Sequence, residues 1–195
     1  YAQAAGVDMN RVQIDGSMGG MGIAVKDMLD GRGADGVFGF VNTLIASAAP
    51  YGVDPATLRF LNWSDVLPEM YGNTLFVTRQ TYQRDRMALA GIVRAVNRGL
   101  ADTVQNPSAA IEALIRHAPG PDHAINLRRL RGTLAIEMAH TEGRRIGIGD
   151  MDDQRLATLI DRIVKVKKLP RTPAVGEVFD RSFLPPLEQR VRNLA

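Results

Sequence analysis

The sequence predicts an α/β protein, with a parallel sheet in its first third and helices through its second half. Strand-like and helix-like segments alternate over residues 11–49, which is typical of strand–helix–strand units with crossover helices. After residue 83 the apolar side chains recur at helical spacing. The net charge changes from −3 over residues 1–80 to +6 over residues 81–195, which indicates a boundary between two regions.

Four short apolar runs are the predicted strands: 11–14, 36–41, 58–61 and 75–78. The first two are each followed by polar residues and then by a helical pattern. In open α/β sheets, ligands bind outside the carboxyl ends of the strands, close to helix N-termini. Asp15 and Ser17 follow the first strand, and Asn42 and Thr43 follow the second, so these four residues are candidate ligand contacts.

Apolar periodicity and cap residues predict the helices: 23–29, 44–49, 87–100, 107–115, 125–140 and 151–166. In the third of these, one apolar stripe is expected to face the core and comprises Met87, Leu89, Ile92, Val93, Val96 and Leu100. Ile92 and Leu114 are expected to be core residues. Prolines break the segment 169–186, which is therefore expected to lie extended over a surface.

The connection between the last two predicted strands, residues 62–73, is rich in aromatic and amide side chains. It contains Trp63, the only tryptophan, together with Tyr71 and Asn73. Aromatic faces with a few amides suit a planar polar organic ligand, because stacking supplies contact area and amides recognise ring nitrogens or carboxylates. The alternative is that Trp63 belongs to the core, and the sequence favours the two interpretations equally.

Composition and spacing exclude several classes of site. The chain has 195 residues, 45% of them hydrophobic and 23% charged, which is typical of a globular protein, and it has no cysteine for a thiolate site. The three histidines have no metal-ligand spacing, and the G-x-G-x-x-G run at 31–36 follows a helix instead of opening one. Basic clusters lack a nucleic-acid module, and no apolar run is long enough to cross a bilayer. We expect no cofactor, no metal, no nucleic-acid partner and no embedding in a membrane.

Several stretches resemble periplasmic substrate-binding proteins of ABC importers: 33–42, 71–78, 92–100, 106–114 and 179–185. The branch is similar to proteins that bind the pyrimidine precursor of thiamine, and it is related to those for sulfonates and taurine. The resemblance extends from Tyr1 to about Pro186. The bias towards arginine, with only four lysines among 24 basic residues, is typical of a GC-rich bacterial genome.

The resemblance implies a two-lobe architecture, like that of the type II periplasmic binding proteins, with the ligand clamped between the lobes. Residues 1–72 then match part of the second lobe, 62–75 a crossover segment, and 73–195 the mostly helical end of the first lobe. The family's first-lobe strands, first crossover and leader have no counterpart here, so the chain is expected to be the C-terminal portion only.

The resemblance also implies ligand contacts. Phe40, Asn42 and Thr43 match the strand end that lines the family's cleft, and Asp15 and Ser17 match a neighbouring loop. The crossover supplies the remaining three candidates, which are Trp63, Tyr71 and Asn73.

The function implied is capture of a small planar or anionic metabolite by hinge closure in the periplasm, and delivery to an ABC permease in the inner membrane. No chemistry is expected. One alternative is an enzyme similar to the eukaryotic pyrimidine-precursor synthases, whose cysteine-rich motif is missing from this sequence. Another is the ligand-sensing domain of a transcription regulator, which would need a helix-turn-helix upstream of Tyr1.

Overall fold

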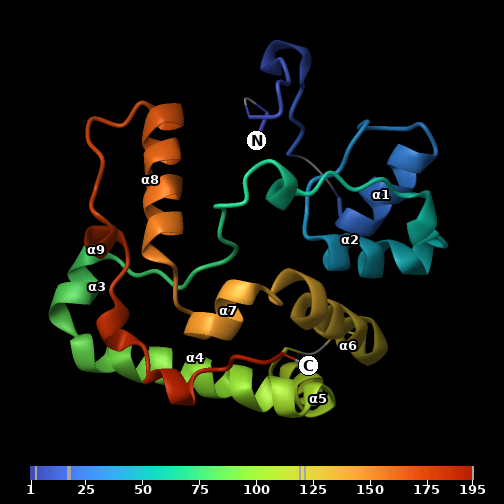
Figure 1. Ribbon diagram of the computed structural model, residues 1–195. Helices are drawn as coiled ribbons and strands as arrows, with labels where there is room; N and C mark the ends of the chain where they lie inside the picture. Colours follow the sequence, from blue (N-terminus) through green and yellow to red (C-terminus); the bar gives the residue numbers. More distant parts are fainter. Residues whose placement is uncertain (3, 17–18, 119, 121, 195) are drawn as a thin grey trace. The chain divides into compact units, whose positions relative to one another are not determined.

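The computed structural model describes residues 1–2, 4–16, 19–118, 120 and 122–194, and these fold as helices joined by extended segments (Figure 1). They form two compact units, each built from two stretches of the chain. Unit 1 combines Tyr1–Leu67 with Pro107–Glu137, and unit 2 combines Pro68–Asn106 with Met138–Ala195. The domain boundary inferred from sequence at residues 72–73 stays a prediction.

The helices of unit 1 are α1 (Met21–Leu29), α2 (Val41–Ala48), α5 (Pro107–His117) and α6 (His123–Gly132), and α6 continues into a π-helical turn, η5 (Thr133–Glu137). Its short 3-10 turns are η1 (Met9–Arg11), η2 (Ala49–Tyr51), η3 (Pro55–Thr57) and η4 (Trp63–Asp65). The helices of unit 2 are α3 (Arg79–Arg84), α4 (Arg86–Gln105), α7 (Thr141–Ile146), α8 (Asp153–Lys167) and α9 (Val175–Val178), with 3-10 turns η6 (Arg181–Phe183) and η7 (Leu187–Gln189).

The α/β prediction is wrong, because the described residues form no strand and no sheet. The prediction of a two-lobe architecture like that of the type II periplasmic binding proteins is wrong as well, because it rests on the same α/β fold. A strand is stable only when a neighbouring strand takes up its N–H and C=O groups. The four predicted strands make no backbone hydrogen bonds to one another within the described chain, and apolar side chains in them lie in solvent, with Phe76 88% exposed.

The helix predictions are confirmed in position for α1, α2, α4, α5 and α8. The predicted helix 125–140 is α6 followed by the π-helical turn η5, while α3, α7 and α9 were not predicted. Aspartates cap the N-termini of three helices. Asp85, Asp122 and Asp152 each accept a backbone N–H of the first turn of α4, α6 and α8, at 2.7–3.2 Å.

The core of unit 1 lies where α1 packs against α2. Val25 of α1 contacts Leu44 and Ala48 of α2, and Val53 closes the cluster from the following loop. The two helix backbones approach closely at Gly22, where a Cβ atom would overlap the carbonyl oxygen of Ser47. Glycine at this position is therefore a packing requirement.

The core of unit 2 is centred on one face of α8. Leu156, Leu159 and Ile160 are buried there. The residues packed around them are Met70, Tyr71, Met151, Val164, Val175 and Phe179. Tyr71, one of the predicted ligand contacts, therefore packs against the buried face of α8.

The predicted apolar stripe of α4 is only partly buried. Leu89 is buried, whereas Met87, Ile92 and Val96 are exposed. In α5 the buried residue is Ile111, and Leu114 is exposed, so the expected core positions of Ile92 and Leu114 are wrong. Periodicity locates a helix, but which turn of it meets a neighbour depends on packing distant in sequence.

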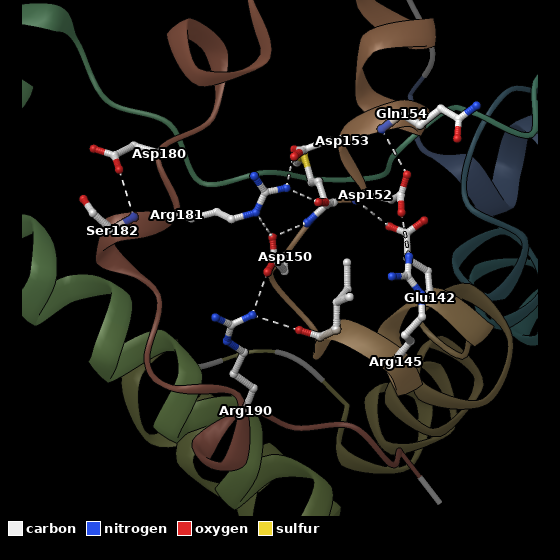
Figure 2. Close-up of polar contacts among 12 residues, drawn as sticks. Glu142, Arg145, Asp150, Asp152, Asp153, Gln154, Asp180, Arg181, Ser182 and Arg190 are labelled. Atoms are coloured by element: carbon white, nitrogen blue, oxygen red, sulfur yellow. Dashed lines mark hydrogen bonds and ion pairs between the residues drawn. The ribbon is translucent and has the colours of Figure 1, made fainter.

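The C-terminal tail of unit 2, here residues 181–190, is held by Asp150, whose side chain is 9% exposed (Figure 2). Its Oδ1 accepts a hydrogen bond from Arg181 Nε and its Oδ2 one from Arg190 Nη1, both at 2.7 Å. Arg190 also donates to the carbonyl oxygens of Ile146 at 2.9 Å and Pro185 at 2.7 Å. Ion pairs therefore hold the tail in place. The prediction that 169–186 lies extended is only partly right, because α9 and η6 interrupt that segment.

Candidate functional site

Three aromatic rings gather on the surface of unit 1. Trp63, the first residue of η4, stacks on Tyr1 with ring centroids 5.6 Å apart and 23° between the planes. The Phe38 ring lies 5.3 Å from Trp63 at 42°. Trp63 is 39% exposed and Phe38 is exposed as well, so neither ring is enclosed in a core. Aromatic faces open to solvent in this way can stack against a planar ligand.

The residues at the start of α2 are covered by α6 and η5. Phe40 precedes α2 and is exposed, but Asn42 is only 9% exposed. The Asn42 backbone N–H donates to Glu137 Oε1 at 3.2 Å, and Thr43 Oγ1 accepts a hydrogen bond from Arg129 Nη2 at 3.4 Å. The Asn42 side-chain nitrogen is buried and has no hydrogen-bond partner among the described residues. This helix start is thus occupied by the protein's own side chains.

The remaining candidates are scattered. Asp15 is exposed, Ser17 lies outside the described residues, and Asn73 is exposed in the segment before α3. Asn73 and Tyr71 belong to unit 2, whereas the other described candidates belong to unit 1. The proposal that these eight residues contact a ligand stays a prediction. Neither unit contains all of the described candidates.

Tyr71 lies in a polar network beside an open cavity of about 410 Å³ in unit 2. The cavity is lined by His140, Thr141, Glu142, Arg145, Asp152 and Arg155. The Tyr71 hydroxyl donates to Glu142 Oε1 at 2.6 Å and accepts from the Asp152 backbone N–H at 2.9 Å. Arg155 places its guanidinium 4.1 Å from the centre of the Tyr71 ring, in cation–π geometry.

Two arginine–carboxylate pairs hold this network in place. Arg155 Nη1 donates to Glu142 Oε2 at 3.1 Å and Nη2 donates to the Met70 carbonyl oxygen at 2.7 Å. Arg145 Nη2 donates to Asp152 Oδ2 at 2.6 Å (Figure 2). Asp152 also caps α8, so the pairs fix the start of α8 against α7.

The network shifts the pKa of its acidic groups in opposite directions. Burial, and then the hydrogen bond to Glu142, raises the pKa of Tyr71 from 10.0 to about 12. Burial pushes the pKa of Glu142 upward, but hydrogen bonds from Tyr71 and Arg155 outweigh it and hold the pKa below its usual 4.5. The Glu142 carboxylate is therefore stabilised as an anion, and the Tyr71 hydroxyl as a neutral donor.

We expect Tyr71 to ionise near pH 12 in the folded protein. Since its pKa is about 10 when unfolded and about 12 when folded, the stability it contributes is complete below pH 10 and is lost as the pH rises through 12. Tyrosinate absorbance after a rapid pH jump, taken as wild type minus Tyr71→Phe, should give this midpoint. In concentrated urea the same difference should return to about 10, and a native midpoint near 10 would contradict the network.

The sequence pointed to Tyr71 but not to its partners. Glu142 and Arg155 are 71 and 84 residues away from it, and no local pattern marks such a pairing. One signal was present, because aspartates directly before an apolar pattern of helical spacing are typical of a helix N-terminus. The acidic cluster at 150–153 is therefore typical of the start of a helix, and Asp152 is the residue that caps α8. The pattern does not show that the capped turn borders a cavity.

The described residues contain neither a candidate metal site nor a helix suited to cross a membrane. No group of three or more histidine, aspartate or glutamate side chains is arranged to hold a metal ion among the described residues. Within the same ranges, no helix combines the length and apolar character that a membrane crossing needs.

Comparison with known proteins gives one match. Residues 1–110, more than half of the chain, match the family described as NMT1/THI5 like. No curated protein and no solved structure matches the chain. The matched range contains the ring surface of unit 1 as well as Tyr71, and it agrees with the resemblance to the thiamine-precursor and sulfonate branch of substrate-binding proteins. The chain belongs to the NMT1/THI5 like family, whose members include substrate-binding proteins of that class.

Proposed function

We propose that the protein captures a small organic solute in the periplasm and delivers it to an ABC permease in the inner membrane. The observation that carries this proposal is the family match over residues 1–110. In this proposal the protein binds the solute and catalyses no reaction. The ligand we propose is a planar or anionic metabolite, similar to the pyrimidine precursor of thiamine or to a sulfonate such as taurine.

The exposed rings of unit 1 support a planar ligand. Trp63 stacks on Tyr1 by one face, whereas Phe38 is tilted at 42° to it, and both Trp63 and Phe38 stay exposed. An aromatic pair contributes about 0.5–1.5 kcal/mol beyond the area that it buries. A heteroaromatic solute stacked on Trp63 would gain this contact, and polar groups around it would select among planar rings.

We expect Trp63→Ala to weaken solute binding at least severalfold while the fold is retained. The measurement is calorimetric titration of the intact protein with a hydroxymethyl-aminopyrimidine and with taurine, after a thermal-shift screen that includes both. Phe76→Ala is the control, since it also removes an exposed aromatic ring, but in the other unit. Equal affinities of the Trp63→Ala variant and the wild type would remove the ring surface from the site. No binding of any pyrimidine, sulfonate or carboxylate would contradict the proposed function itself.

A further inference from the structure

The two carboxylates that line the cavity of unit 2 each accept three hydrogen bonds from the protein itself. Glu142 Oε1 accepts from the Tyr71 hydroxyl and the Asp152 N–H, and its Oε2 accepts from Arg155. Asp152 Oδ1 accepts the N–H groups of Gln154 and Arg155, and its Oδ2 is bonded to Arg145. Both acidic groups are thus compensated by donors of the protein itself.

Several donors at the same cavity are left over. Arg145 uses one Nη atom for Asp152, and its Nε and other Nη make no contact that the described residues provide. His140 Nδ1 accepts the Glu142 backbone N–H at 3.1 Å, so a neutral His140 ring carries its proton on Nε2. Thr141 is exposed, and its hydroxyl has no partner in the described chain. The unused hydrogen-bonding capacity of the cavity is therefore mainly that of donors.

The charge of unit 2 favours the same kind of ligand. Its sequence holds 16 lysine and arginine residues against 11 aspartates and glutamates, a net charge of +5, while unit 1 carries −2. A positive surface raises the local concentration of anions. The cavity volume of about 410 Å³ is within the range of roughly 300–1,000 Å³ that small organic ligands occupy, and it exceeds what a bare inorganic anion fills.

We propose that this cavity binds a small organic oxyanion, a molecule whose carboxylate or phosphate group is held by Arg145, Thr141 and His140. The Arg145 guanidinium supplies the charge-assisted hydrogen bonds, and the other two side chains supply neutral ones. The Arg155–Glu142 pair joins α7 to the first turn of α8 beside the cavity. This site is separate from the ring surface of unit 1 and does not depend on the solute proposed for it.

The test is calorimetric titration of the full chain with three probes of similar size: benzoate, phenyl phosphate and neutral benzamide. We expect at least one anion to bind, and benzamide to bind on the order of tenfold more weakly, because it lacks the charge. Benzoate alone or phenyl phosphate alone would assign the head group as carboxylate or phosphate. No binding of either anion at roughly millimolar concentration would overturn the proposal.

Arg145→Gln should weaken binding of that anion on the order of tenfold. Arg171→Gln is the matched control, because it removes the same charge from unit 2 at a side chain of similar exposure, 64% against 61% for Arg145. Its partner is Glu177, which does not line the cavity. We expect the control to change affinity less than twofold, and Thr141→Val to weaken binding without loss of charge. Equal weakening by both arginine variants would show general attraction by a basic surface and would contradict a built site.

A different outcome separates this proposal from the transport role. If a solute from the periplasmic screen binds and depends on Trp63, while neither anion binds at the cavity, the transport role stands and the oxyanion site is wrong. If an anion binds in an Arg145-dependent way while no solute binds to the ring surface, the oxyanion site stands and the transport role is wrong.

Discussion

Gly22→Ala should destabilise unit 1 by about 3 kcal/mol, the upper end of the usual cost of overpacking a core. A Cβ at this position would overlap the carbonyl oxygen of Ser47 and lie 2.7 Å from its carbonyl carbon and 2.8 Å from Tyr51 Cε2. The tyrosine ring can turn aside, but the Ser47 backbone belongs to α2 and is fixed by its helix. The two helices must therefore separate, which loosens the contacts of Val25 with Leu44 and Ala48.

Trp63 provides the measurement, because the only tryptophan of the chain lies in the same unit as Gly22. Urea unfolding followed by its fluorescence should show a lower midpoint for Gly22→Ala. Gly36→Ala is the control, since it adds the same methyl group in unit 1, where a Cβ meets nothing within 4 Å. Its effect should be within about 0.5 kcal/mol of zero. Equal midpoints for the two variants would show that α1 and α2 do not pack as described.

The helices of this chain could be located from sequence because their signals are local. Asp85, Asp122 and Asp152 stand where a cap must stand, and Pro107 opens α5, a position where a missing N–H costs nothing. α3 and α7 were missed because they have only six residues each, too few for a periodic apolar pattern.

The strands could not be judged from sequence in the same way. Residues 36–41 and 75–78 read as strands because their apolar side chains suit a buried extended chain, yet Phe38 and Phe76 are exposed. A sheet requires partners for every backbone group, and the sequence of one segment does not say whether those partners are present. Apolar side chains in a short run therefore do not by themselves predict a paired strand.

The candidate site shows the same division between local and distant information. An aromatic residue in an irregular connection is conspicuous in sequence, so Trp63 and Tyr71 were identified as residues of interest. The residues around them were not identified. Phe38, which contacts Trp63, is 25 residues away from it in sequence, and Arg155, which contacts Tyr71, lies in α8, 84 residues away. Asn42 shows the same limit, since its position after a predicted strand made it a candidate ligand contact, whereas residues distant in sequence bury it, and Gly132 of α6 lies against its side chain.

Asp150→Ala should destabilise unit 2 by about 3 kcal/mol, because it leaves the guanidinium of Arg190, which is 13% exposed, without a carboxylate partner. The Asp150 side chain is 9% exposed and bonds both Arg181 and Arg190. The carbonyl oxygens that remain to Arg190 are dipoles, which cannot replace a carboxylate in neutralising a guanidinium. The variant should lower the urea midpoint measured by circular dichroism, and it should expose the tail beyond Arg181 to proteolysis.

The control for this substitution is Asp153→Ala, because Asp153 also pairs with Arg181, at 2.7 Å, but its side chain is 69% exposed. Water already screens that pair, so its loss should cost less than about 1 kcal/mol. A second variant, Asp150→Ala with Arg190→Met, removes the stranded charge and fills its place with an apolar side chain, so it should recover part of the lost stability. If Asp150→Ala and Asp153→Ala had equal effects, burial would not govern the strength of these pairs, and the tail would have to be held by its apolar contacts instead.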